Sequence, residues 1–330
     1  MRMKTRKGVV MKRIAFAVIV LALAVSAGFR GTSAQPAAQA ESELLSLLPD
    51  GSGVVVVDVQ KILSSSFWTT ISQQDKVRSA IEKVQSDISE IGLRLEDLQT
   101  VALGLPASGM KDITGAVTGN FDQANLLLRL RADEKVRLTS ETYKGIEIHK
   151  VNKAGSNDQA GSEEVAFAFY NSATTVFGNI AGVRASVDAQ SGEKPSIVQN
   201  TKLGNALAET SPAAIRFALA VTPGMTSAIK SDQLPLPDFS SISVIFGTAE
   251  FTTAIDLNAT LRNDNAEHAQ AIANQLNGLL AMAKGFLGSS GDPKMAAIVG
   301  ALKTVTVTAS DVDVKITGNL PGEVLAQVLR

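Results

Sequence analysis

Histidine is the side chain most often used as an acid, a base or a transition-metal ligand near neutral pH. The chain has two, His149 and His268. His149 alternates with Ile146 and Ile148, as in a strand with one solvated face. His268 stands beside Glu267 near the start of a long predicted helix. We therefore expect both histidines to be solvent-exposed surface residues, and neither to bind a metal.

Two segments have the Ser-x-x-Lys spacing of the nucleophile and base in penicillin-binding enzymes. They run from Ser108 to Lys111 and from Ser227 to Lys230. The companion Ser-Asp-Asn and Lys-Thr-Gly elements of those enzymes are absent from the sequence. A loose pattern that occurs twice without its companions indicates coincidence. An exported serine hydrolase is therefore the least favoured of our three functional hypotheses.

Other catalytic and ligand-binding motifs are absent as well. The sequence has no Gly-x-Ser-x-Gly, no phosphate-binding Gly-Lys-Ser/Thr, no His-Glu-x-x-His and no calcium-loop spacing of aspartates. Asp311 and Asp313 share one face of a predicted strand, where two carboxylates can hold a divalent cation, but Lys315 follows on the same face and offsets their charge. We predict no catalytic residue, no cofactor-binding residue and no metal site, and expect that the protein is not an enzyme.

Composition limits the possible chemistry and partners further. The chain has no cysteine, which excludes disulfides, thiol catalysis and Cys-ligated metals. The first 34 residues carry seven of the 31 Lys and Arg residues and no acid, so the remainder has 24 basic and 32 acidic residues. Because nucleic-acid affinity comes largely from basic residues that neutralise phosphates, we expect no nucleic-acid partner.

Residues 1–34 have the order of a secretory signal peptide. Lys12 and Arg13 precede an apolar run over residues 14–27, and small residues follow at 32–34. A membrane anchor is the alternative, but about 14 apolar residues fall short of the roughly 20 that span a bilayer. We expect cleavage after Ala34, with Ala27 and Ala40 as alternative sites.

The predicted location is therefore extracytoplasmic, either periplasmic or secreted. No cysteine follows the apolar run, which excludes a lipid-anchored lipoprotein. No later segment reaches 18 apolar residues, so we expect no transmembrane anchor once the signal peptide is removed.

Hydrophobic periodicity predicts a mixture of helices and strands after a flexible N-terminal segment at residues 35–43. Residues 54–57 are four consecutive valines, typical of a buried strand. From residue 75 to 91 the apolar residues recur every three or four positions, which predicts an amphipathic helix. The same criteria predict further strands at 101–105, 116–121 and 146–148, a strand or hairpin at 165–177, a hairpin at 304–317, and helices at 124–130 and 264–286.

A short tripeptide recurs three times between strand-like and helix-like residues. Its copies are Gly119-Asn120-Phe121, Gly178-Asn179-Ile180 and Gly318-Asn319-Leu320. Asn is a preferred N-cap residue because its side chain accepts from free N–H groups at a helix start. Anion binding at these helix starts is the functional alternative, but no basic glycine loop accompanies them. We interpret the tripeptides as structural joints from strand to helix.

The second and third copies lie 140 residues apart, and the same offset relates several strands of the two halves. We infer a diverged duplication, with a first module at 44–190 and a second at 200–330. The predicted fold class is α+β, with two related modules, each a mainly antiparallel sheet covered by helices on one face. Short turns between successive strands favour antiparallel over parallel pairing.

The opening of the first module resembles a class of uncharacterised exported bacterial proteins. In this chain Leu47-Leu48-Pro49 precedes a valine-rich strand that ends at Asp58, and the segment 92–104, GLRLEDLQTVALG, comes later. In those proteins a similar opening of two leucines, a proline, a valine-rich strand and an aspartate precedes a helix and a second strand. The resemblance implies an exported, duplicated α+β protein. It transfers no catalytic residue.

Two functional hypotheses remain besides the hydrolase. The first is a non-enzymatic binding or structural role outside the cytoplasm, with an unknown protein or small-molecule partner. The alternative is a carrier of lipid or another apolar ligand, because the apolar stripe of the helix at 264–286 and the glycine-rich loop at 288–293 are suited to line and gate a cavity. A helix of this kind also covers a sheet in many proteins, and we favour that interpretation of the stripe.

Overall fold

The computed structural model describes most of the chain beyond the predicted signal peptide, namely residues 35–89, 92–107, 113–153, 165–223, 225, 239–289 and 292–329. The signal peptide at 1–34 and both Ser-x-x-Lys segments lie outside the described residues. The predictions made for these segments are therefore not tested by the structure.

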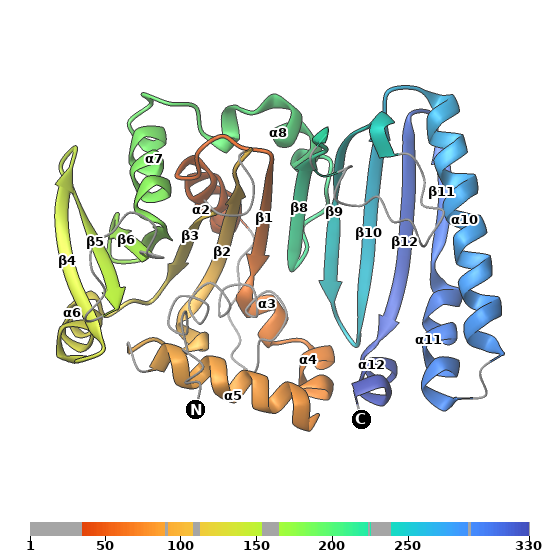
Figure 1. Ribbon diagram of the computed structural model, residues 1–330, viewed down its shortest axis with the longest axis horizontal. Helices are drawn as coiled ribbons and strands as arrows, with labels where there is room; N and C mark the ends of the chain where they lie inside the picture. Colours follow the sequence, from red (N-terminus) through yellow and green to blue (C-terminus); the bar gives the residue numbers. More distant parts are fainter. Residues whose placement is uncertain are drawn as a thin grey trace, which may run out of the picture.

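The described strands form one sheet in the order β11-β12-β10-β9-β8-β1-β2-β3-β7-β6-β5-β4 (Figure 1). Every neighbouring pair is antiparallel. The strands are β1 Gly53–Asp58, β2 Leu98–Leu105, β3 Thr114–Gly119, β4 Val136–Tyr143, β5 Ile146–Lys153, β6 Val165–Phe169, β7 Thr174–Gly178, β8 Ile215–Ala220, β9 Ile242–Phe251, β10 Ala254–Asn263, β11 Thr306–Ser310 and β12 Asp313–Pro321.

The helices lie on both faces of this sheet. They are α2 Gln35–Ser46, α3 Val59–Leu63, α4 Ser66–Ile71, α5 Asp75–Ser89, α6 Gln123–Ala132, α7 Ile180–Gln190, α8 Thr201–Ala208, α10 Ala266–Gly288, α11 Pro293–Thr304 and α12 Gly322–Leu329. Short 3-10 helices are η1 Leu95–Asp97, η3 Ile197–Gln199 and η4 Phe239–Ser241.

Strand β1 joins the two halves of the sheet. One edge of β1 pairs with β2 and the other with β8, and Val54 lies opposite Ala218 of β8. Successive side chains of a strand point to opposite faces, so a run of valines supplies apolar groups to both. The valines of β1 accordingly divide between two buried clusters, one on each face.

The first face is covered by α2, α7 and α8. Its cluster runs from the leucines of α2 through β1, β2 and β3 to Val244 and Phe246 of β9, so it crosses from residues 44–190 into residues 200–330. The bridge between Pro49 and Ser196 ties the end of α2 to the segment before η3. The two segments that we predicted as modules therefore share one sheet and one core.

The second face is covered by α3, α4 and α5 near β1, by α6 near β5, and by α10 near β11 and β12. The side chains of β9 show that α10 lies on the second face. Ile245 packs against the α10 cluster, whereas its neighbours Val244 and Phe246 belong to the first face.

The predicted α+β class and antiparallel pairing are confirmed. Two details of the prediction are corrected. The strands form one continuous sheet instead of two, because β1 and β8 pair, and helices cover both faces instead of one. Residues 35–43, predicted as a flexible segment, lie within helix α2.

The two halves of the sheet share a strand order. Counting outward from the centre, the first half runs β1-β2-β3-β7-β6 and the second runs β8-β9-β10-β12-β11. The elements between the third and fourth strands differ, since the first half has α6, β4 and β5 where the second has α10 and α11. This order agrees with the offset of 140 residues, and a duplication remains a prediction.

One of the three Gly-Asn joints acts as predicted. Asn179 is the N-cap of α7, and its side chain accepts from the Gly182 N–H at 2.7 Å. At the first joint the N-cap of α6 is Asp122 instead of Asn120. At the third, Asn319 remains within β12, and its side-chain amide donates to Asp256 at 2.6 Å.

Leu48 tests the shared core. Its side chain is 0% exposed, and its carbonyl accepts from the Ile197 N–H at 2.9 Å, so it contacts both halves of the chain. We expect Leu48→Ala to lower the free energy of unfolding by about 2–5 kcal/mol, because a cavity remains in a packed site. Leu128→Ala, at a side chain that is 66% exposed, serves as the control. Chemical denaturation should show a change within about 0.5 kcal/mol for the control, and a similarly small effect of Leu48→Ala would contradict the shared core.

Candidate functional site

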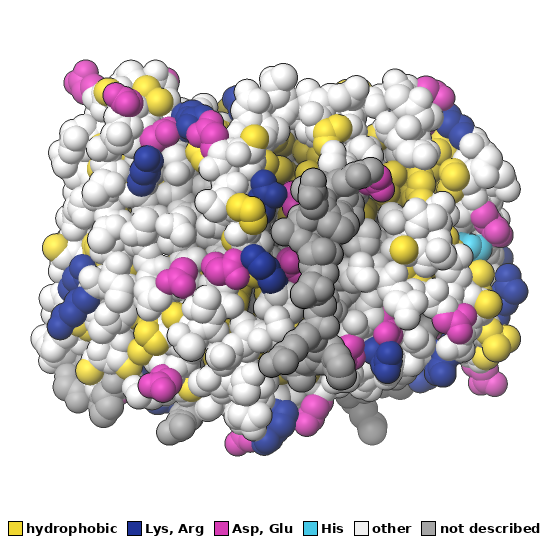
Figure 2. Space-filling view, turned by 180° about the vertical axis from the view of Figure 1, so that it is seen from behind, with side chains coloured by type: hydrophobic (Ala, Val, Ile, Leu, Met, Phe, Trp, Pro, Cys, Tyr) yellow, Lys and Arg dark blue, Asp and Glu magenta, His cyan; other side chains and the backbone are white. Residues whose placement is uncertain are grey.

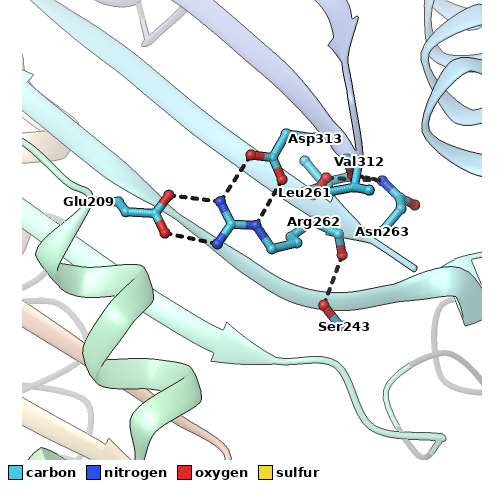
Figure 3. A network of polar contacts seen from close by, with 7 residues as sticks. All are labelled: Glu209, Ser243, Leu261, Arg262, Asn263, Val312 and Asp313. Carbon is cyan, nitrogen blue, oxygen red and sulfur yellow. Dashed lines mark hydrogen bonds and ion pairs between the residues drawn. The ribbon is translucent and has the colours of Figure 1, made fainter. Parts of the chain in front are cut away.

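Arg262 is at the centre of the polar network drawn in Figure 3. It lies on β10, directly opposite Asp313 of β12, and donates to both oxygens of that carboxylate at 2.9 Å. The Nη1 and Nη2 groups of the same guanidinium donate to the two carboxylate oxygens of Glu209 at 2.8 and 2.7 Å. Glu209 is the C-cap of α8, and the guanidinium also lies 5.1 Å from the centre of the Phe246 ring.

These contacts fix the charges of the Arg262 network. The hydrogen bonds to Glu209 and Asp313 raise the pKa of Arg262, and the bond from Arg262 lowers the pKa of Glu209. A guanidinium that is bound on two sides by carboxylate pairs has little capacity left for a ligand. The network therefore joins α8 to strands β10 and β12. Asp313, which we considered as half of a cation site, is a partner of Arg262.

A second network surrounds Asp188 of α7, which is buried. Its carboxylate accepts from the Tyr143 hydroxyl at 3.0 Å and from Lys144 Nζ at 2.5 Å, and pairs with Lys194 at 2.8 Å. Lys144 also donates to Glu193 at 2.5 Å. The hydrogen bonds from Lys144 and Lys194 hold the pKa of Asp188 well below its usual range.

The backbone of the β4–β5 turn aims Lys144 at this carboxylate. Lys144 and Gly145 both have positive φ angles, 50° and 84°, as a two-residue type I′ turn requires. The turn places Lys144 against α7, and so attaches the hairpin of β4 and β5 to that helix. A carboxylate held in its charged form by two lysines is suited to this structural task and not to proton transfer.

His149 is buried, with a 4% exposed surface, so the prediction of a surface residue is wrong. The strand does alternate, with Ile148 in the cluster of the first face. The opposite face is covered by α6, and there the ring of His149 lies 5.1 Å from Phe167 and 5.9 Å from Phe169. Burial lowers the pKa of His149, so the neutral form is favoured.

His268 is exposed, as predicted. Its Nδ1 lies 2.7 Å from a carboxylate oxygen of Asp264, and its backbone N–H donates to the N-cap residue Asn265. The two histidines lie on β5 and α10 respectively, and the structure does not bring them together. Within the described part of the chain, no group of three or more His, Asp or Glu residues is arranged to hold a metal ion.

Acidic and basic side chains are interspersed on the face of the molecule seen from behind, and they do not gather there into a patch of one sign (Figure 2). This arrangement contrasts with the basic stripe expected of a nucleic-acid-binding face.

The helical hairpin formed by α10 and α11 is the most unusual region of the described structure. The core-facing residues of α10 are Ala269, Ile272 and Ala273, and from there to Val314 no described side chain is buried. Large apolar residues nevertheless continue, and Met282 and Phe286 are 60% and 78% exposed. We call the exposed residues of α10 after Ala273, together with those of α11, the hairpin surface.

Small residues and two lysines, Lys294 and Lys303, complete the hairpin surface. A Cβ atom added at Gly278, Gly285 or Gly300 would meet nothing within 4 Å, so the surface is unobstructed there. The charged residues from position 269 to 304 are Lys284, Asp292, Lys294 and Lys303. None of the described helices, including α10, is long and apolar enough to cross a membrane.

This surface was not predicted as a site. The sequence indicated an apolar stripe over residues 264–286, and the structure shows that its C-terminal half extends beyond the packed core. The signal available in the sequence was the scarcity of charge, since Lys284 is the one charged residue between His268 and Asp292. Helix α11 received no prediction, because residues 294–303, between the glycine-rich loop at 288–293 and the hairpin expected at 304–317, were assigned to no element.

Comparison with known proteins gives limited information. No family model and no curated protein matches the chain. The structure of TP0453 in crystal form I is similar to this chain with a TM-score of 0.48 and 13% sequence identity, and the match covers 87% of this chain and 96% of that one. Crystal form IV of TP0453 is similar with a TM-score of 0.46 and 12% identity, over 86% of this chain and 95% of that one. Because both scores lie below 0.5, the fold and site described above stand on the geometry of this chain alone.

The Arg262 network predicts a specific requirement for arginine. Arg262→Lys keeps the charge but loses the paired donors that bind two carboxylates at once. We expect the free energy of unfolding, measured in urea, to fall by about 1–3 kcal/mol. Arg78→Lys is the control, because Arg78 pairs with Asp75 where both side chains are more than half exposed, and its effect should stay within about 0.5 kcal/mol. Equal effects of the two substitutions would contradict a structural role for the network.

Burial of His149 predicts a pH-dependent stability. The folded pKa is lowered, so as pH falls through the ordinary value of 6.5 the unfolded chain takes up a proton that the folded chain does not. The stabilising contribution of neutral His149 is therefore fully present above about pH 6.5. Below that pH the free energy of unfolding decreases by up to about 1.4 kcal/mol per pH unit. Denaturant unfolding between pH 5 and 7 measures this slope. We expect His149→Phe to reduce it, and an unchanged slope would show that His149 is not its source.

Proposed function

We propose that the chain is exported by residues 1–34 and acts outside the cytoplasm as a non-enzymatic protein that binds through the hairpin surface. Export rests on the basic residues, apolar run and small residues of the leader. The binding role rests on one observation above all, the exposure of Met282 and Phe286 on a hairpin in which no described side chain after Ala273 is buried.

Exposed side chains of this size are costly unless they serve a contact. Leaving a Phe or Met side chain in water forgoes about 1.5–3 kcal/mol relative to full burial. Single exposed apolar residues are ordinary, but contiguous apolar surface marks binding sites. Met282 and Phe286 are four residues apart, so they lie one above the other on the same side of α10.

The polar residues of the described structure support a binding role over a catalytic one. Asp188 and Arg262, whose charges are the most strongly fixed, have their hydrogen-bonding groups occupied by other side chains of the chain. The buried His149 faces two phenylalanine rings. These groups maintain the fold, whereas Met282 and Phe286 of the hairpin surface are 60% and 78% exposed.

Photo-crosslinking in the native host tests this proposal. With the photo-crosslinker p-benzoylphenylalanine in place of Phe286, we expect the processed chain in the extracytoplasmic fraction to form specific adducts on irradiation. Val198 is the matched control position, since it is an apolar side chain with 45% exposure outside the hairpin. Met282→Asp should reduce the adducts at 286 without lowering the melting temperature, because the residue is exposed.

Three results would count against the proposal. Equal adducts at positions 198 and 286, or none at either, would remove the hairpin surface as the binding site. Retention of the unprocessed chain in the cytoplasm would remove the location. A lipid that stays bound at one molecule per chain through purification, found by native mass spectrometry, would favour the carrier hypothesis instead.

A further inference from the structure

The hairpin differs in charge from the rest of the chain. From position 266 to 304 it has three lysines and two acids, Glu267 in the first turn of α10 and Asp292. The aspartate is occupied, since Asp292 caps α11 by accepting from the Lys294 N–H at 2.8 Å. After residue 34 and outside the hairpin, 21 basic residues face 30 acidic ones. The hairpin is thus a basic segment of an acidic chain.

Its lysines are available for an external partner. Among the described residues, Lys284, Lys294 and Lys303 form none of the ion pairs, in contrast to Lys144, Lys150 and Lys194. A helix is about 10 Å across, which is close to the screening length at 0.1 M salt. Lysines on any side of the hairpin therefore contribute to the potential at a surface that Met282 and Phe286 contact.

We infer that the partner of the hairpin surface is an anionic lipid bilayer, on which α10 and α11 lie with Met282 and Phe286 in the headgroup region and the lysines near lipid phosphates. The inference rests on the proposed function and specifies its partner. Apolar residues on one side of a helix combined with lysines are typical of interfacial membrane binding. Long lysine side chains can bury their stems while the charged end stays at the headgroups.

A second copy of the chain fits this surface less well. In a symmetric dimer the hairpin of one copy would face the same lysines of the other, which is electrostatically unfavourable. A lipid surface requires no shape complementarity and supplies the opposite charge. The unobstructed glycines at 278, 285 and 300 allow a close approach to a flat partner.

The absence of cysteine from the sequence allows a direct test. Phe286→Cys and Val198→Cys, each in the chain from Gln35 that carries every described element, are labelled with the environment-sensitive fluorophore NBD. The chains are mixed with vesicles of phosphatidylcholine, or of phosphatidylcholine and phosphatidylglycerol in equal parts. We expect a blue shift and stronger emission at position 286 with the anionic vesicles, and no change at 198.

Charge reversal examines the role of the lysines. Lys284→Glu, Lys294→Glu and Lys303→Glu combined should weaken partition onto anionic vesicles by about tenfold or more, and added salt should weaken the parent in the same direction. Circular dichroism confirms that the combined variant keeps its helices. An unchanged partition in a folded variant would overturn the role of the lysines.

The remaining outcomes separate this inference from the proposed function. Equal shifts with both vesicle types would overturn the anionic preference. No shift with vesicles, together with crosslinked protein adducts at 286 in the host, would overturn the lipid partner and leave the binding role intact. A shift that depends on protein concentration without vesicles would make the hairpin surface a contact between copies. Equal shifts at 198 and 286 would overturn binding through the hairpin altogether.

Discussion

The pairing of β1 with β8 holds the two halves of this molecule in one sheet. Each edge of β1 is hydrogen-bonded to a strand, and each of its faces lies under a different set of helices. A strand in this position must be apolar at consecutive residues, and the four valines at 54–57 satisfy that requirement. The core below α2, α7 and α8 extends across this junction, so neither half has a separate core on that face.

Toward the two ends of the sheet, ion pairs help to hold helices and strands together, as apolar packing does at the centre. The Asp188 network attaches the hairpin of β4 and β5 to α7, and the Arg262 network attaches α8 to β10 and β12. Both sets of charges are occupied within the molecule. Against that background the hairpin of α10 and α11 is an exception, because Met282, Phe286 and two of its lysines, Lys294 and Lys303, remain exposed to solvent.

Elements with a strong periodic signal were predictable from the sequence. The helix expected at 75–91 is α5, the long helix expected at 264–286 is α10, and the hairpin expected at 304–317 contains β11 and β12. Strand β4 gave no such signal, since it is a polar edge strand whose residues are only partly covered. Helix α11 was missed because residues 294–303 were assigned to no element.

The two largest errors have a common cause. Alternation of apolar and polar residues indicates a strand, but it does not show whether the second face is solvated or covered. His149 was therefore placed at the surface, although α6 covers it, and the sheet was expected to carry helices on one face. Exposure of the hairpin surface was hidden in the same way, because an apolar stripe on a helix does not reveal what it contacts.

The central pairing also has a consequence for the time course of folding. Val54 of β1 lies opposite Ala218 of β8, a separation of 164 positions along the chain. Ribosomes deliver a chain from its N-terminus, so β1 can pair with β2 early but has an open edge until about two thirds of the chain has emerged. Such long-range pairings form slowly, and an open strand edge is a template for pairing with other chains. During that interval the valine-rich strand that later joins the halves can pair with other chains through its open edge, and protecting that edge limits aggregation.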